Sequence, residues 1–280
     1  MKQVIYILAG ATLMFTACGE EASREETADN MDTQETVMKA TPINMTEVKG
    51  SPDFFGATIL LGDISTKPDD ENVKVTFNFN VKNYALKKQT EDAASKMCNN
   101  SEKGQHIHFI LDNEPYAALY DPTHTVSLAK NTEHYLLAFL SRSYHESLKN
   151  KEAALMYHFK IDEKGKVVKM DDPGTPMVFY SRPKGDYIGE DNTTNLLFDF
   201  YPWNTELSNN GNKVLARIQA DNMDTTMTVD KWQAYFLHNL PTGKPKITLT
   251  LADKDGNKID GPMTEVTREF TLAHDEPLPQ

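Results

Sequence analysis

The stretch VKVTFNFNV at residues 73–81 is the clearest indication of the fold class, because apolar and polar side chains alternate along it without a break. Successive side chains of a β-strand point to opposite faces of its sheet, so this pattern predicts a strand with one face buried and the other in water. Strand patterns recur along the chain beyond residue 50, and residues 134–140 are apolar on both faces, as in a central strand. We therefore predict an all-β protein, with further strands at 107–111, 134–140, 155–161, 196–201, 214–220, 247–251 and 266–272.

These strands fall into two sets that resemble each other. Segment 75–86 (VTFNFNVKNYAL) parallels 196–207 (LLFDFYPWNTEL), segment 123–126 (THTV) parallels 226–229 (TMTV), and a late strand follows each, at 135–140 and 247–251. A set of about 100 residues and about seven short strands has the size of an immunoglobulin-like β-sandwich. We predict two tandem immunoglobulin-like β-sandwich domains. Chance similarity between two β domains is the alternative.

Composition places the boundaries of these domains. The residues after Cys18 are acidic and poor in aromatic side chains, which predicts a disordered tether. We expect a turn or two of helix at 90–97 and at 230–237, and hairpin-type turns at 209–211 (NNG) and 255–256 (DG). The predicted segments are a lipoprotein signal peptide at 1–17, an acidic tether at 18–48, β-sandwich domain 1 at 49–162, a connector at 163–185, and β-sandwich domain 2 with a short tail at 186–280.

The N-terminus has the pattern of an export signal. Lys2 is followed by an apolar run at residues 4–15 and by small residues directly before Cys18. The run is too short for a membrane-spanning helix, which needs roughly twenty apolar residues. A small residue followed by Cys resembles the bacterial lipobox, in which the Cys is freed by cleavage and acylated. We therefore predict a lipid anchor at Cys18 that attaches the protein to a membrane. An ordinary signal peptide with a chance cysteine is the alternative.

Charge and cysteine content narrow the range of partners. The formal net charge of −12 argues against nucleic acid as a partner, because nucleic acid requires a basic face. Cys98 is the only cysteine besides Cys18, so no intramolecular disulfide is expected and the fold depends on its core. A lone thiol in this position is predicted to be packed rather than nucleophilic.

Histidines form the most concentrated group of chemically useful side chains. His106 and His108 lie two residues apart on a predicted strand and so point to the same face. His145 follows the late strand of the first set, and pairing of the strands in a sandwich would bring it near the other two. Three imidazoles would suit Zn or Cu. The alternative is that these histidines lie at the surface or core edge and bond to the backbone, with no cofactor.

A second candidate group is basic. The segments FLSR at 139–142 and FYSR at 179–182 share a pattern, and Lys184 follows the second. The guanidinium group of arginine matches carboxylate or phosphate, so Ser141, Arg142, Arg182 and Lys184 are candidate residues for an anionic ligand. The alternative is that Arg142 and Arg182 pair with acidic residues at a domain junction.

Motifs of known enzymes are absent from the sequence. It contains neither Gly-x-Ser-x-Gly, nor His-Glu-x-x-His, nor a glycine-rich phosphate loop, and we predict that the protein is not an enzyme. The segment DKDGNKID at 253–260 spaces oxygens as a calcium loop would, but it lacks the distal Glu, so we predict an ordinary turn.

Three segments carry a resemblance to a known group: GQHIHFILDNEPY at 104–116, LSRSYHESLK at 140–149 and FYSRPKG at 179–185. They are similar to a family of Bacteroidetes envelope lipoproteins whose members are commonly labelled phosphopeptide-binding proteins. The resemblance implies that phosphopeptide binding would fall on Arg142, Arg182 and Lys184. It also implies an outer-membrane location, because surface lipoproteins of these bacteria often carry an acidic cluster after the lipidated Cys, as at residues 20–26.

Together these observations predict a lipid-anchored binding protein of the bacterial cell envelope. It would be an outer-membrane lipoprotein, surface-exposed or periplasm-facing, that recognises a peptide, protein or glycan ligand of anionic or phosphorylated character. The first alternative is a Zn- or Cu-binding envelope protein that uses His106, His108 and His145. The second is a structural component of the envelope.

Overall fold

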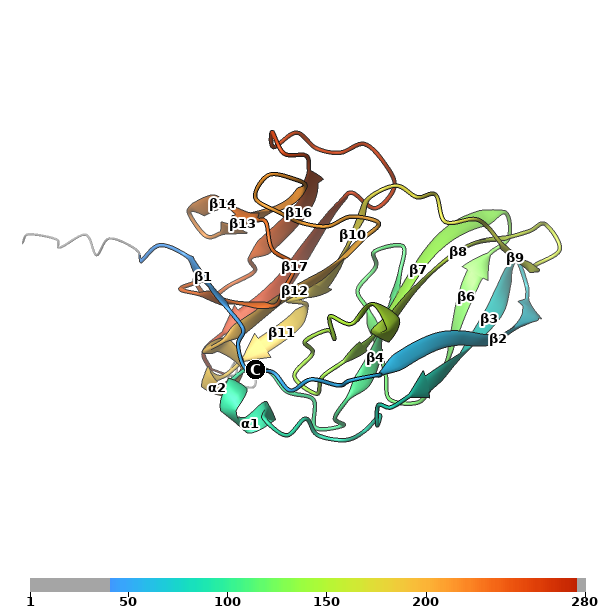
Figure 1. The fold of residues 1–280 in the computed structure, drawn as a ribbon, viewed down its shortest axis with the longest axis horizontal. Helices are drawn as coiled ribbons and strands as arrows, with labels where there is room; N and C mark the ends of the chain where they lie inside the picture. Colours follow the sequence, from blue (N-terminus) through green and yellow to red (C-terminus); the bar gives the residue numbers. More distant parts are fainter. Residues whose placement is uncertain (1–40, 276–280) are drawn as a thin grey trace, which may run out of the picture. The chain divides into compact units, whose positions relative to one another are not determined.

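The computed structural model describes residues 41–275, which are built almost entirely of β-strands and loops (Figure 1). This confirms the predicted all-β class. Within residues 41–275, helical segments are limited to α1 (Ala93–Lys96), the 3₁₀ turn η1 (Lys151–Ala153) and α2 (Glu190–Thr193). The predicted signal peptide, Cys18 and the tether up to residue 40 lie outside the described residues. Between residues 41 and 275, no helix combines the length and the apolar character of a membrane span.

The first half of the described chain is a β-sandwich, called here the first sandwich. A sheet of order β2-β3-β6 faces a sheet of order β5-β4-β7-β8-β9. Phe77 on β3 reaches across the gap, with its ring centroid 5.5 Å from that of Phe109 and 5.7 Å from that of Phe159. The strands are β2 (Thr58–Asp69), β3 (Asn72–Lys82), β4 (His106–Leu111), β5 (Ala117–Leu119), β6 (Thr123–Ala129), β7 (Thr132–Ser141), β8 (Ala154–Ile161) and β9 (Val167–Lys169).

Strand β3 carries the alternation at residues 73–81 as predicted. Its apolar residues Val73, Val75, Phe77 and Phe79 are buried in the sandwich core, and the polar residues between them face outward. Burying a Phe or Val side chain contributes about 1.5–3 kcal/mol, so these four side chains are a major stabilising element of the first sandwich.

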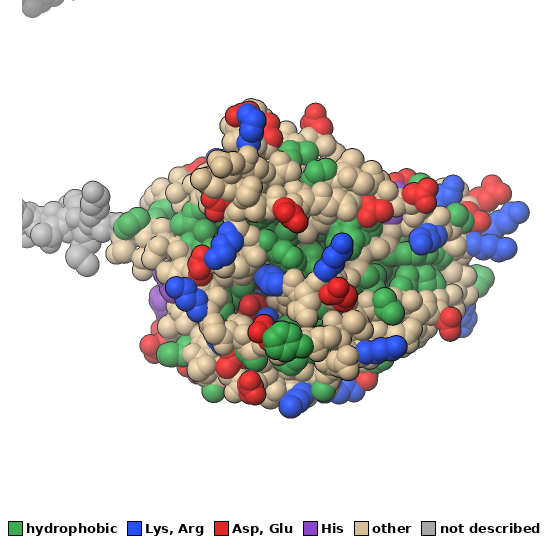
Figure 2. Space-filling model, viewed as in Figure 1, with side chains coloured by type: hydrophobic (Ala, Val, Ile, Leu, Met, Phe, Trp, Pro, Cys, Tyr) green, Lys and Arg blue, Asp and Glu red, His purple; other side chains and the backbone are tan. Residues whose placement is uncertain are grey.

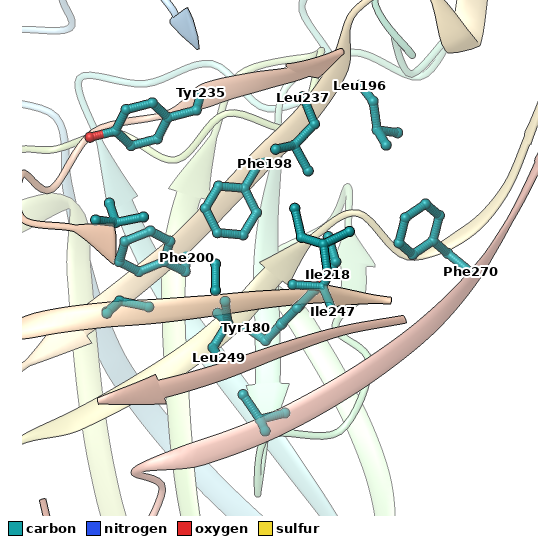
Figure 3. Packing of buried hydrophobic residues seen from close by; sticks show 14 of the residues in the cluster. Tyr180, Leu196, Phe198, Phe200, Ile218, Tyr235, Leu237, Ile247, Leu249 and Phe270 are labelled. Atoms are coloured by element: carbon teal, nitrogen blue, oxygen red, sulfur yellow. The ribbon is translucent and has the colours of Figure 1, made fainter. Parts of the chain in front are cut away.

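The second half of the described chain is also a sandwich, called here the second sandwich. A sheet of order β1-β15-β12-β10 faces one of order β11-β17-β16-β13-β14. Figure 3 shows Phe198 and Phe200 of one sheet packing toward Ile247 and Leu249 of the other. The strands are β1 (Asn44–Glu47), β10 (Met177–Arg182), β11 (Gly185–Ile188), β12 (Leu196–Trp203), β13 (Lys213–Ala220), β14 (Met223–Val229), β15 (Tyr235–His238), β16 (Lys246–Ala252) and β17 (Glu265–Ala273).

The two sandwiches share one strand order. The sheet β2-β3-β6 corresponds to β10-β12-β15, and β5-β4-β7-β8 corresponds to β14-β13-β16-β17. All of these neighbours are antiparallel, so each half has three strands facing four in an immunoglobulin-like arrangement. Strands β1, β9 and β11 are additions at sheet edges.

One of the three repeat matches in the sequence was wrong. Residues 123–126 lie on β6, next to β3, whereas residues 226–229 lie on β14, next to β13 in the opposite sheet. The strand that corresponds to β6 is β15, which pairs with β12. A four-residue match such as THTV and TMTV is too short to reflect which sheet a strand joins, because sheet assignment depends on long-range pairing.

A third hydrophobic cluster joins the two sandwiches. Ile110, Leu137 and Phe139 from the outer face of the first sandwich pack with Phe179 and Tyr201 from the second. Strand β7 is therefore covered on both sides, by its own core and by the second sandwich. This explains why residues 134–140 are apolar on both faces.

Several segments predicted as irregular contain strands. Residues 44–47, at the end of the predicted tether, form β1, because the edge of β15 supplies a backbone ladder for them. The predicted connector at 163–185 contains β9, β10 and the start of β11, and all of β10 is buried. Strand β10 pairs with β12 and packs against the first sandwich, so these residues belong to the core of the fold.

The local predictions had mixed outcomes. Helix α1 lies within the predicted 90–97 segment, but Tyr235–His238 in the predicted 230–237 helix is strand β15, held between β1 and β12. The 209–211 turn is present, with the Gly211 N–H donating to the Ser208 carbonyl at 3.1 Å. It connects β12 and β13, which lie in opposite sheets, and is therefore not a hairpin turn.

Candidate metal centre

Strand β4 positions two of the predicted histidines. His106 and His108 alternate with Ile107 and Phe109, which point into the core of the first sandwich. The two histidines consequently lie on the opposite face, together with Ile110, where the second sandwich covers them. Both have 0% of their surface exposed, so neither is a surface histidine.

A tight turn after β7 brings the third histidine to the same place. The His145 N–H donates to the Arg142 carbonyl at 2.9 Å, and the Arg142 N–H donates to the Glu146 carbonyl at 2.9 Å. His145 has a φ of 71°, in the left-handed region that few non-glycine residues occupy. Because β7 pairs with β4 in the register His106–Ser141, this turn lies directly beside His106.

The three imidazole rings converge. His106 Nε2 lies 3.0 Å from His108 Nε2 and 3.0 Å from His145 Nδ1, and one ring nitrogen from each residue falls within 4.8 Å of the others. A metal ion bound at about 2.0–2.1 Å by each nitrogen would hold tetrahedral ligands about 3.3 Å apart. For two of the three nitrogen pairs, the observed distance of 3.0 Å is therefore within a few tenths of an ångström of the distance expected between metal ligands.

Hydrogen bonds on the far side of two rings set their orientation. His106 Nδ1 lies 2.8 Å from the Gly104 carbonyl oxygen, which can only accept, so this nitrogen carries the proton. A neutral imidazole then has its lone pair on Nε2, which faces the cluster. His108 Nδ1 lies 3.0 Å from Ser181 Oγ on β10. An outer bond of this kind is the usual support of a metal-binding histidine.

The surroundings keep the three rings neutral. Burial lowers the pKa of His106 to about 4, with the nearby Arg182 and Lys184 adding in the same direction. Burial also holds the pKa values of His108 and His145 well below the usual range. All three residues are therefore deprotonated at neutral pH, the state in which imidazole can bind a metal.

Tyr116 completes the cluster. Its ring stacks on that of His108 with the centroids 3.6 Å apart and the planes 9° from parallel. Its hydroxyl lies 3.2 Å from His145 Nδ1, and burial raises its pKa. Lys184 covers the ring too, with Nζ 4.2 Å from the centroid and donating to the Tyr116 carbonyl at 2.8 Å. Tyr116 thus links the histidines to the basic residues of the second sandwich.

The predicted anion-binding residues do not come together as one site. Arg142 is buried; it forms an ion pair with Glu146 at 3.4 Å and donates to the carbonyls of Pro52 and Ser147. Ser141 is buried and its hydroxyl donates to the Arg142 carbonyl at 3.2 Å. These contacts are structural. The pairing of Arg142 with Glu146 agrees with the alternative in which this arginine pairs with an acidic residue of the protein.

Arg182 and Lys184 lie beside the histidine cluster, where both contact the ring of Tyr116. Arg182 donates to Tyr187 Oη at 2.6 Å and to Asn99 Oδ1 at 2.7 Å, and it makes no ion pair with an acidic side chain among residues 41–275. Its Nε is buried and has no hydrogen-bond partner within the same range. The junction alternative, in which Arg182 pairs with an acidic residue, is therefore not observed.

Two residues of the site were missed in the sequence. Tyr116 and Ser181 lie in the quoted segments 104–116 and 179–185, but nothing in their spacing indicates contact with histidines. Ser181 is 73 positions from His108 in the chain, and only the packing of the two sandwiches brings them together. Two other candidates proved to be structural. Cys98 is buried, which raises its pKa to about 12, and Asp253 accepts hydrogen bonds from the backbone of its own turn at 2.9 Å.

Comparisons with known proteins add little to these observations. No protein-family model matches the chain, and no curated protein matches it. Among solved structures, the fibronectin(III)-like modules of Clostridium thermocellum CbhA align over 72% of this chain and 86% of theirs, with 10% identity and a TM-score of 0.26. The fold assignment rests on the strand order given above. The strand order and the site identify a protein of two immunoglobulin-like β-sandwiches with a buried three-histidine cluster.

Proposed function

We propose that this chain is a copper-binding protein of the bacterial cell envelope and that His106, His108 and His145 are the metal ligands. The observation that carries the proposal is the convergence of three neutral imidazoles, with 3.0 Å between His106 Nε2 and each neighbouring nitrogen. The Gly104 carbonyl orients His106 so that the lone pair, and not the proton, faces the other two rings.

The charge of the surroundings favours copper over zinc, the second metal that imidazoles suit. The cluster lies near Arg182 and Lys184, whose charges lower the pKa values of all three histidines. Repulsion from these cations is half as large for Cu(I) as for a divalent ion. A buried site without a carboxylate ligand therefore suits Cu(I).

The cellular setting belongs to the same proposal and is supported by the sequence alone. Export and acylation at Cys18 would anchor the protein to the outer membrane, with the acidic segment after Cys18 as a tether. The resemblance to Bacteroidetes envelope lipoproteins supports this location. A surface-exposed and a periplasm-facing orientation both fit it.

Recognition of an anionic or phosphorylated peptide has weaker support. All four candidate residues already make hydrogen bonds within the fold. Ser141 donates to the Arg142 carbonyl and Arg142 to the Pro52 carbonyl, while Arg182 donates to Tyr187 and Asn99 and Lys184 donates to the Tyr116 carbonyl. On the face that Figure 2 shows, basic and acidic side chains are interspersed, so this face offers no basic surface for an acidic peptide. A purely structural role would require neither metal nor ligand.

Metal analysis tests the proposal directly. The chain from Gly19 onward, purified without lipid, is incubated anaerobically with Cu(I), desalted and analysed by mass spectrometry of the metal. Competition with a chromophoric Cu(I) chelator then measures affinity. We expect a single copper ion per chain in the native protein, and loss of most of this copper in a His108→Ala variant.

A matched variant distinguishes the site from general histidine binding. His238 lies on β15 and contacts Thr46 Oγ1 at 2.8 Å, outside the cluster, so His238→Ala should retain the copper. Circular dichroism checks that both variants are folded. A native protein that elutes without copper after this treatment would refute the proposal, and so would full retention of copper by a folded His108→Ala variant.

A further inference from the structure

A second candidate site lies where β12 ends. A pocket of about 780 Å³ is lined by Tyr201 and Trp203 of β12, by residues 204–207 of the following loop, and by Trp232 and Lys151 from other parts of the chain. This volume is within the range of about 300–1,000 Å³ typical of small-molecule sites. The pocket shares no residue with the histidine cluster.

Aromatic rings form the wall of this pocket. The chain contains only two tryptophans, Trp203 and Trp232, and both line it. Trp203 Nε1 donates to Asp172 Oδ2 at 3.0 Å, and Trp232 Nε1 donates to the Phe200 carbonyl at 3.0 Å. Tyr201 packs edge-on against Trp232, with 4.6 Å between the ring centroids. The rings are held in fixed orientations, because the polar group of each indole is bonded away from the ligand space.

Polar side chains of both charge signs surround the aromatic wall. Lys151, Asn204 and Glu206 line the pocket and are exposed. Lys151 and Glu206 make no ion pair with any residue in the 41–275 range, so an ammonium and a carboxylate are both available to a ligand. Their opposite charges cancel, which makes the pocket a poor site for an ion of either sign and leaves hydrogen bonding as the main polar interaction.

We propose that this pocket binds a neutral oligosaccharide. A pyranose ring has an apolar face of C–H groups, which can lie on an indole ring, and a rim of hydroxyls, which both donate and accept hydrogen bonds. The wall formed by Trp203 and Trp232 matches that face. The Lys151 ammonium, the Glu206 carboxylate and the Asn204 amide oxygen match the rim, while the Asn204 nitrogen donates to Asp172 at 2.6 Å. Proline-rich peptides also bind aromatic grooves. A rim of mixed donors and acceptors favours the hydroxyl-rich ligand.

Calorimetry with defined sugars tests this proposal. The chain from Gly19 onward is titrated with cellohexaose, maltohexaose, mannohexaose and chitohexaose, and in parallel with a polyproline decapeptide. We expect saturable binding of at least one sugar and none of the peptide. Because both tryptophans line the pocket, the same sugar should also shift the intrinsic fluorescence.

Substitution of Trp203 tests the location of the site. Trp203→Ala should weaken sugar binding at least about tenfold, and Trp203→Phe, which keeps an aromatic ring, should weaken it by less than about threefold. Phe55→Ala removes an aromatic side chain that is 86% exposed and not part of the pocket, and it should leave sugar binding unchanged. Failure of all four sugars to bind, binding of the peptide in their place, or unaltered affinity in a folded Trp203→Ala variant would each overturn the proposal.

Discussion

The carboxylate of Asp199 is a buried charge on which the turn carrying His145 depends. Asp199 lies on β12 with 0% exposure and accepts from Lys149 Nζ at 2.6 Å and from the Ser147 N–H and hydroxyl, each at 3.1 Å. Asp199→Asn keeps the shape of the side chain and removes its charge. Breaking a buried ion pair costs about 3–5 kcal/mol. The Lys149 side chain is 26% exposed and can turn to water. We therefore expect a loss of stability at the low end of this range, about 3 kcal/mol.

Denaturation measures this loss. For a folded region of this size, about 3 kcal/mol corresponds to a fall in Tm of roughly 6–12 °C. The matched control is Asp224→Asn, which removes the charge from an ion pair with Arg217 whose side chains are about half exposed. Exposed pairs contribute about 0–1 kcal/mol, so the control should remain close to the native protein. A loss of less than about 1 kcal/mol in Asp199→Asn, or equal losses in the two variants, would refute this account of the buried pair.

Three further predictions concern the cluster and the core. In the metal-free protein, an unfolded His106 takes up a proton below about pH 6.5, whereas the folded residue stays neutral until its pKa of about 4. His106 alone should therefore lower the free energy of unfolding by about 2 kcal/mol between pH 7.5 and pH 5. Urea titrations at the two pH values should show a smaller decrease for the His106→Gln variant than for the native protein. An identical pH dependence in the two proteins would contradict this prediction. Ser181→Ala removes the hydrogen-bond partner of His108 Nδ1 and should lower the copper affinity about 10–100-fold in the chelator assay. Unchanged copper affinity in this variant would contradict the prediction. Phe77→Ala should destabilise the first sandwich by about 3–5 kcal/mol in denaturant titration, because Phe77 is buried between the two sheets. Phe55→Ala, at an exposed position, should change the stability by less than about 0.5 kcal/mol. Comparable effects of the two substitutions would contradict the importance of Phe77 for core packing.

Strands with a regular pattern were predictable because local chemistry determines them. The alternation at residues 73–81 corresponds to β3, and His106 and His108 share a face because side chains of a strand repeat every two residues. The approach of His145 to these two histidines was predicted by placing the strand that precedes it, β7, beside β4. The register of β4 and β7 confirms this pairing.

Features that depend on distant partners were not predictable. Strand β1 has the sequence NMTE, without apolar alternation, and forms because β15 offers a free edge. Ser181 reaches His108 only because the two sandwiches pack together, and no local pattern encodes that contact. The same packing places Arg182 beside the cluster and leaves it without an acidic partner among the described residues, which its sequence neighbours did not indicate.

The shared strand order gives the two sandwiches equivalent outer faces on their four-stranded sheets. Only one of these two faces is covered by the other sandwich. The cross-strand pair His108–Phe139 on β4 and β7 is enclosed by the second sandwich, while the corresponding strands β13 and β16 pair Arg217 with Thr248 on a face open to water. The first sandwich therefore holds imidazoles at positions that face water in the second, because the second sandwich covers them. The shielded site depends on both sandwiches, and neither would form it alone.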